Sequence, residues 1–111
     1  MTITLAHSKF AVVQPTGHLN AATTSTFQKH LDAAVRDNET SRLLVDMSQV
    51  DFMDSAGLMA LVSSLKLSRS LNCRLSLCSV LPSIRILLEL TQLDDVFEVF
   101  EDRVAFEKVV A

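Results

Sequence analysis

The chain has 111 residues, 49% of them hydrophobic, and a formal net charge of −3. This length predicts one domain whose core buries roughly 65% of the surface that the unfolded chain exposes. No apolar run approaches the ~20 residues that cross a bilayer, and the amino terminus lacks the basic region and cleavage site of a signal peptide. We therefore expect a soluble cytoplasmic protein with no membrane partner. The slight negative charge provides no basic face for nucleic acid.

Three apolar runs in the first half of the chain predict β-strands. Residues 2–6 and 10–14 are separated by three residues, which is the length of a hairpin connection. Pro15 and Gly17 end the second run, because proline cannot donate to a sheet ladder and glycine readily adopts positive φ. The run Leu43–Met47 has apolar side chains on both faces, which is typical of a strand inside a sheet.

Helical spacing of apolar residues predicts two amphipathic helices in the same part of the chain. The first begins near Thr23 or Thr24, either of which suits the N-cap position, and ends near Asn38. Its core face is predicted to be Phe27, Leu31, Ala34 and Val35. The second begins at Ser55 and runs to about Ser70. Its core face is predicted to be Leu58, Leu61, Val62 and Leu65, and its outer face Ser63, Ser64, Lys66 and Arg69.

The last third of the chain continues the alternation of strands and helices. A strand is predicted over Arg74–Cys78, then a helix that begins over Ser79–Pro82, because proline suits the first helical turn. A short edge strand within Asp94–Phe100 precedes a last helix over Asp102–Val110. The predicted core faces of these helices are Ile84, Leu87, Leu88 and Thr91 in the first, and Phe106, Val109 and Val110 in the last. The order indicates an α/β fold, with a mixed sheet of four to five strands packed with about four helices.

The most informative stretch is Asp54-Ser55-Ala56-Gly57, where a strand region turns into the second helix. Helix capping is one explanation, because Asp54 or Ser55 can accept a bond from a free backbone N–H, worth about 1 kcal/mol. Gly57 suggests more than capping, since glycine in a helix costs roughly 1 kcal/mol relative to alanine. A glycine placed there suggests close approach by another backbone or by a partner. Both explanations stay open at this point.

Catalysis by Ser55 is not supported by the surrounding sequence. A hydrolase elbow has the pattern Gly-x-Ser-x-Gly, but Met53 stands where its first glycine belongs. No histidine follows Ser55, so a base would have to come from His7, His18 or His30. A phosphate-binding Gly-x-x-x-x-Gly-Lys loop is also absent. We therefore expect a protein that is not an enzyme.

Neither a phospho-acceptor aspartate nor a metal site is well supported. Asp46 lies in an apolar strand, as in receiver domains, but residues 14–17 lack the acidic pair that would hold magnesium. Cys73 and Cys78 lack the spacing of a zinc half-site, and a disulfide between residues five apart along one strand is awkward. We expect two free thiols, no metal and no cofactor.

Four motifs resemble the STAS domains of bacterial anti-sigma factor antagonists. They are Gly17-His18-Leu19-Asn20, Leu44-Val45-Asp46-Met47-Ser48, Val50-Asp51-Phe52-Met53-Asp54-Ser55-Ala56-Gly57-Leu58 and Leu88-Glu89-Leu90-Thr91-Gln92-Leu93-Asp94-Asp95-Val96-Phe97. The resemblance runs in order through nearly the whole chain and implies a single STAS domain over residues 1–111. The Asp-Ser-Ala-Gly-Leu element is its most specific part.

The resemblance implies a phosphorylation switch at Ser55. In such proteins this serine is phosphorylated by a partner that is both a serine kinase and an anti-sigma factor. The unphosphorylated form binds that partner and releases the sigma factor, and a PP2C-type phosphatase restores it. Two departures from the family pattern are Asn20, where aspartate is common, and Gln92, which replaces a common glycine at the end of the third helix.

The resemblance also implies a partner surface around the serine. We expect it to comprise Asn20, Thr23, Met53, Asp54, Ala56, Gly57, Leu58 and Met59, with Asn20, Thr23, Met53, Leu58 and Met59 in its exposed part. Methionine suits adaptable contact with a partner, but Met53 and Met59 suit the core equally well. A phosphate at the start of a helix is favoured by the helix dipole and the free N–H groups. The alternative is a constitutive interaction scaffold or small-ligand sensor without a switch. We expect a monomer in either case.

Overall fold

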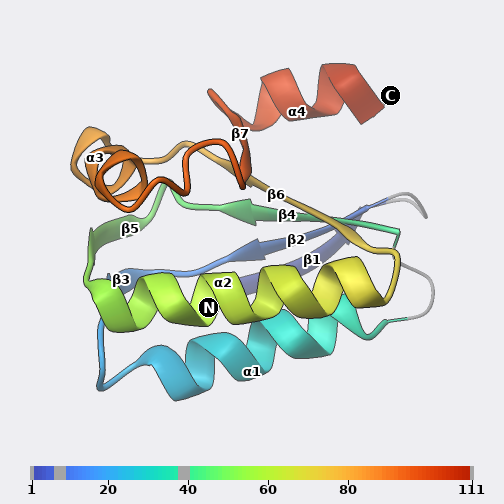
Figure 1. Ribbon diagram of the computed structural model, residues 1–111. Coiled ribbons are helices and arrows are strands. Elements are labelled where there is room, and N and C mark those ends of the chain that lie inside the picture. Colours follow the sequence, from blue (N-terminus) through green and yellow to red (C-terminus); the bar gives the residue numbers. More distant parts are fainter. Residues whose placement is uncertain (1, 7–9, 38–40, 111) are drawn as a thin grey trace.

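The computed structural model describes residues 2–6, 10–37 and 41–110 (Figure 1). The elements in chain order are β1 (Thr2–Ala6), β2 (Phe10–Gln14), β3 (Gly17–Leu19), α1 (Thr24–Val35), β4 (Arg42–Asp46), β5 (Val50–Met53), α2 (Ser55–Ser70), β6 (Arg74–Cys78), α3 (Pro82–Leu90), β7 (Glu98–Phe100) and α4 (Arg103–Val110). The connection predicted at residues 7–9 lies outside the described residues. The first helix ends at Val35, three residues before the predicted end near Asn38. No helix of the described part is long and apolar enough to span a bilayer.

The main sheet has five strands in the order β1-β2-β4-β6-β7. Only β1 is antiparallel to its neighbour, so the sheet is mixed, as predicted. Leu43 on β4 is aligned with Ala11 on β2 and with Leu75 on β6. The central position of β4 confirms the prediction made from its two apolar faces. β3 and β5 form a separate parallel pair that the sequence interpretation did not anticipate.

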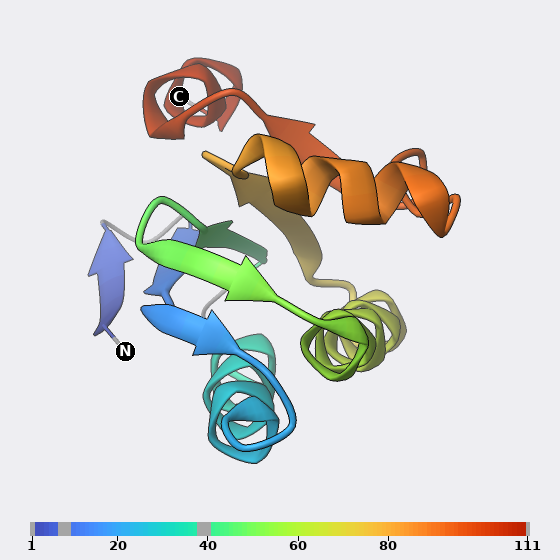
Figure 2. The same cartoon turned by 90° about the vertical axis from the view of Figure 1, so that its left-hand side faces the viewer.

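Helices cover both faces of the sheet, as Figures 1 and 2 show. α1 and α2 lie side by side on one face, α4 lies on the other, and α3 packs near β5 beyond one end of the strands. Side chains alternate between the two faces along each central strand. On β4, Leu43 and Val45 join the core beneath α1 and α2, whereas Leu44 joins a smaller cluster beneath α4. The sheet is therefore apolar on both sides.

The predicted core face of α1 is confirmed, since all four of its residues are buried. On α2, Ser64 was assigned to the outer face, and this assignment is wrong. Its side chain is fully buried, and its hydroxyl donates to the Asp32 carboxylate of α1 at 2.9 Å. A small polar side chain fits where two helices pack closely, because its hydroxyl finds a partner across the contact.

The cluster beneath α4 forms around Phe106, which is fully buried against Val12, Leu44 and Cys78. The docking role predicted for Val109 is wrong, because 60% of this residue is exposed to solvent. The helix is short, and its buried side is narrow enough for one aromatic ring to fill most of it.

The region between α3 and β7 differs from the prediction in two details. Thr91 was assigned to the core face of α3, but it is exposed just after the helix ends, and its hydroxyl donates to the carbonyl of Leu87 at 2.8 Å. The edge strand is confirmed but is shorter than predicted, because the Val96 and Phe97 N–H groups bond the Leu93 carbonyl in a turn. Strand pairing therefore begins only at Glu98.

Gln92 adopts φ 60°, so the departure from glycine noted in the sequence carries a backbone cost. The left-handed conformation costs an ordinary residue about 1–2 kcal/mol, and glycine avoids this at a smaller entropic cost in the unfolded state. We expect Gln92→Gly to raise the free energy of unfolding by about 0.5–1 kcal/mol, measured by urea denaturation. Asn72→Gly is the control at φ 57° and should change it less, because asparagine tolerates this region. A destabilised Gln92→Gly variant would contradict the argument.

Candidate functional site: the Ser55 corner

The strand that leads into the corner is β5, a four-residue strand that lies outside the main sheet. β5 pairs in parallel with β3, and Leu19 is aligned with Met53 at the ends of the two strands. Both chain segments therefore emerge at one place. Figure 2 faces this end of the molecule, with β3 and β5 in front and the start of α2 beside them.

Asp54 is the N-cap of α2. Its backbone is extended (φ −104°, ψ −173°), and its carboxylate Oδ1 accepts a hydrogen bond from the Gly57 N–H at 3.1 Å. Its carbonyl accepts the first helical bond, from the Leu58 N–H. The capping explanation is thus confirmed, and Asp54 supplies the cap rather than Ser55.

The backbone of β3 leaves no room for a side chain at Gly57. A Cβ atom added at this position would lie 2.4 Å from the Leu19 carbonyl oxygen and 2.9 Å from the Leu19 Cβ. The same carbonyl accepts a hydrogen bond from the Asp54 N–H at 3.1 Å. The close approach predicted from the glycine is therefore made by another part of this chain. This contact packs the end of β3 directly against the start of α2.

The loop after β3 is held by its own polar side chains. The Asn20 side-chain oxygen accepts from the Ala22 N–H at 3.0 Å. The Thr23 hydroxyl donates to the His18 carbonyl at 2.8 Å and accepts from the Asn20 N–H at 3.0 Å. Thr23 occupies the N-cap position of α1, but its side chain makes no capping bond to that helix. These bonds fix the conformation of residues 20–23, here called the Asn20 loop, beside the Ser55 corner.

Ser55 is the first residue of α2 and its side chain is exposed. Within the described residues, nothing hydrogen-bonds the Ser55 hydroxyl. The backbone N–H groups of Ser55 and Ala56 belong to the first turn, where a helix leaves its donors without intrahelical partners. An accessible hydroxyl beside such donors is well placed to carry a phosphate, because both the helix dipole and the N–H groups favour an anion there.

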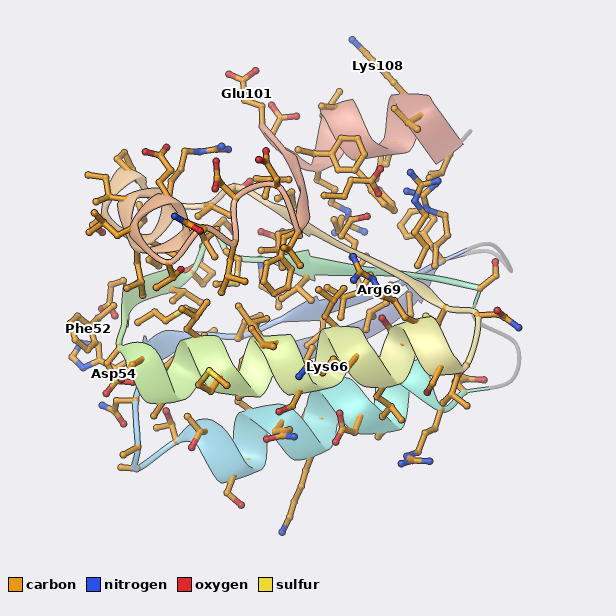
Figure 3. The ribbon with its side chains drawn as sticks, in the orientation of Figure 1. Phe52, Asp54, Lys66, Arg69, Glu101 and Lys108 are labelled. Atoms are coloured by element: carbon orange, nitrogen blue, oxygen red, sulfur yellow. The ribbon has the colours of Figure 1, made fainter. Side chains whose placement is uncertain are left out.

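The surface around the corner is acidic. Asp51 is exposed on β5 three residues before Asp54, and its carboxylate lies 3.3 Å from His18 Nε2. The sequence contains no lysine or arginine from residue 43 to residue 65 or from residue 10 to residue 28. In Figure 3 Phe52 and Asp54 lie together at the end where α2 begins, whereas Lys66 lies farther along that helix.

The residues predicted to contact a partner differ in their exposure to solvent. Thr23 and Met59 are exposed, and Asn20, Asp54 and Ala56 are partly exposed. The expectation that Leu58 forms part of the exposed surface is wrong, because it is 3% exposed and belongs to the core. Of the two alternatives for Met53, the core position is the one observed, since it is 6% exposed. Phe52 was missed as an exposed residue, although it is 48% exposed. The sequence offers no signal for this exposure, because the alternation of a strand would place Phe52 on the same face as the buried Val50.

The other groups weighed from the sequence have structural roles. Asp46 is buried at the end of β4, where its carboxylate accepts from the Ser48 N–H at 3.0 Å and from the Gln14 amide at 3.3 Å. Cys73 and Cys78 are free thiols and both are buried. Burial, followed by the charge of Asp46, raises the pKa of Cys78 to about 11. In the described part of the chain, no group of three or more metal-ligating side chains comes together.

Removing the cap should weaken the corner measurably. Asp54→Ala is expected to lower the free energy of unfolding by about 1 kcal/mol, because the Gly57 N–H loses its side-chain acceptor. Urea denaturation measures the change. Asp51→Ala is the control, since an exposed carboxylate in contact with an exposed side chain, His18, should contribute less than about 0.5 kcal/mol. Equal changes in the free energy of unfolding for the two variants would show that the capping bond stabilises the protein no more than an exposed surface contact does.

This architecture, with a serine at the start of the helix after β5, is that of a known class of domains. The chain belongs to the STAS domain family, whose family model matches residues 3–105. This match confirms the resemblance noted in the sequence motifs.

Proteins similar to this chain include anti-sigma factor antagonists. Over 98 residues the chain is 22% identical to an anti-sigma F factor antagonist of Paenibacillus polymyxa, a match that covers 88% of this chain and 84% of the relative. An anti-sigma factor antagonist from Mycobacterium paratuberculosis has the same fold, with TM-score 0.83 and 24% identity over 98% of this chain and 94% of the other. The Bacillus cell fate determinant SpoIIAA in its phosphorylated form superposes with TM-score 0.74 and 15% identity, over 97% of each chain.

Proposed function

We propose that this chain is an anti-sigma factor antagonist whose partner binding is switched by phosphorylation of Ser55. The unphosphorylated form binds a protein that is both an anti-sigma factor and a serine kinase, and thereby releases a sigma factor. Phosphorylation of Ser55 ends this binding, and a PP2C-type phosphatase restores it. In this scheme the chain is the substrate of its partner's active site and performs no catalysis of its own.

The observation that carries the proposal is the exposed hydroxyl of Ser55 at the first position of α2, to which no residue in the described part of the chain hydrogen-bonds. The hydroxyl can enter a kinase active site without any rearrangement of the fold. A phosphate would add about −1.5 to −2 charge next to Asp54. The names of the relatives, an anti-sigma F factor antagonist and a phosphorylated SpoIIAA, support the same function.

The direct test is phosphorylation by the anti-sigma factor kinase encoded in the same genome. Incubation with this kinase and ATP should add one phosphate, and peptide mapping should locate it on Ser55. Ser63 is a matched control, because it is an exposed serine in the middle of the same helix and should stay unmodified. Modification elsewhere, with Ser55 untouched, would refute the proposal.

A constitutive scaffold or small-ligand sensor is the alternative. The observation that favours a sensor is a hollow of about 250 Å³ beside the Asn20 loop, lined by Thr16, His18, Leu19, Ala22, Thr23, Thr26 and Phe27. This volume is below the roughly 300–1,000 Å³ of most small-molecule pockets, so the switch is the better supported function. Intact-mass measurement on protein from native cells separates the two, since a scaffold would show no phosphorylated form under any growth condition.

The proposal extends to the domain count, the oligomeric state and the cellular location of the protein. We place the whole chain, residues 1–111, in one STAS domain that acts as a monomer in the cytoplasm. Sedimentation equilibrium of the purified protein tests the monomeric state.

A further inference from the structure

A groove with an apolar lining lies between β5 and α3, next to the Ser55 corner. It has a volume of about 270 Å³ and is lined by Phe52 and Met53 from β5 and by Ser83, Ile84, Ile86, Leu87 and Leu90 from α3. Three of these side chains are largely in solvent, with Phe52 48%, Ile86 54% and Leu90 78% exposed. We refer to this feature as the α3 groove.

The α3 side of the groove is a continuous helical stripe. Ser83, Ile86, Leu87 and Leu90 follow the spacing i, i+3, i+4 and i+7, so they lie along one side of the helix. The core contact of α3 is made by the buried residues Ile84 and Leu88, and Leu87 also packs against the core. Ile86 and Leu90 lie outside that core cluster and are 54% and 78% exposed, so these two side chains are not needed to hold α3 on the domain.

The charge around the groove distinguishes between possible occupants. Asp51 and Asp54 flank Phe52 along the chain, and the outer side of α3 carries the exposed pair Arg85 and Glu89. The resulting acidic balance repels an anionic lipid surface, and a second copy of this chain would bring its own acidic corner against the first. A protein segment with basic flanks fits this surface.

We propose that the α3 groove binds an amphipathic helix of the protein that contacts the Ser55 corner, with leucine-like side chains on one face and lysine or arginine beside them. Helices commonly bind in this way, with anchors spaced i, i+3, i+4 and i+7 along an apolar groove. A volume of about 270 Å³ accommodates anchor side chains rather than a drug-sized ligand. The inference rests on the proposed function, because it assumes a protein partner at that corner.

Photo-cross-linking identifies the occupant. The photoreactive residue p-benzoylphenylalanine replaces Leu90 in the full chain, expressed in cells of the source organism, and mass spectrometry identifies the attached segment. The same replacement of Val109, 60% exposed on α4, is the control. Attachment from position 90 alone to an amphipathic helix with basic flanks supports the proposal. Attachment to a second copy of the chain, to an acidic segment or to no protein overturns it.

Affinity for the purified anti-sigma factor kinase of the same genome provides a second test. Ile86→Ser with Leu90→Ser should weaken binding about 10- to 100-fold, because two anchors lose their buried contact. Val104→Ser with Val109→Ser, at positions 59% and 60% exposed on α4, should change it less than about twofold. An unchanged affinity in the Ile86/Leu90 variant refutes the proposal that a helix of the partner binds in the α3 groove. Ser55→Asp in the same assay tests the switch separately, so the failure of either proposal is visible without the other.

Discussion

Replacing Ser55 by aspartate is expected to weaken binding of the anti-sigma factor kinase by at least about tenfold, and full phosphorylation by about 100-fold or more. A partner that covers Ser55 would face a new negative charge beside Asp54 and the already acidic surface of Asp51. Like charges brought together in an interface cost several kcal/mol, and each ~1.4 kcal/mol is a factor of ten in affinity. Isothermal titration calorimetry with the purified kinase measures the change.

Ser55→Ala is the matched control for this prediction. It removes the phosphorylatable hydroxyl but adds no charge, and it should bind with nearly the affinity of the unmodified protein. Circular dichroism should show the same fold for both variants, since position 55 is exposed and its side chain makes no hydrogen bond within the described residues. If Ser55→Asp bound as tightly as Ser55→Ala, the electrostatic mechanism of the switch would be wrong.

Gly57→Ala is expected to lower the free energy of unfolding by about 1–2 kcal/mol, although alanine is the better helix former by roughly 1 kcal/mol. The opposite sign is expected because the new Cβ would lie 2.4 Å from the Leu19 carbonyl oxygen. A backbone atom in a paired strand cannot move aside without disturbing its ladder, and overpacking of this kind typically costs 1–3 kcal/mol. Urea denaturation provides the measurement.

Ser63→Ala, on the exposed side of the same helix, is the control for Gly57→Ala. It should stabilise the protein by up to about 0.5 kcal/mol, through helix propensity alone. A Gly57→Ala variant that behaves like Ser63→Ala would show that β3 does not press against the start of α2. Binding of the kinase should also fall in Gly57→Ala, because the Leu19 end of β3 and the adjoining Asn20 loop would have to shift relative to Ser55.

The parts of the fold that were predictable from the sequence are those with long periodic patterns. The bounds of α2 and of β6 agree with the prediction, because sixteen and five residues keep one period throughout. β3 and β5 were missed because each is only a few residues long. Gly17 to Leu19 follows a proline and a threonine and has the composition of a turn. In β5 two exposed residues stand between two buried ones, which breaks the alternation of a strand.

The site was predictable in its chemistry but not in its contacts. The position of Ser55 at the start of a helix follows from local patterns, and Gly57 correctly signalled a close neighbour. That the neighbour is Leu19 depends on the pairing of β3 with β5, which joins distant parts of the chain. The burial of Met53 and Leu58 likewise depends on tertiary packing. Single-sequence patterns carry no information on such long-range contacts.

The contact between Leu19 and the start of α2 bears on how a modifying enzyme would recognise its substrate. The Leu19 carbonyl holds the Asp54 N–H, and it lies against Gly57. A linear peptide containing residues 50–60 lacks β3 and therefore lacks the geometry that presents Ser55. An enzyme that contacts the Asn20 loop together with Ser55 would act on folded molecules and pass over nascent or denatured chains. Phosphorylation would then report on the conformational integrity of each copy as well as on the signal.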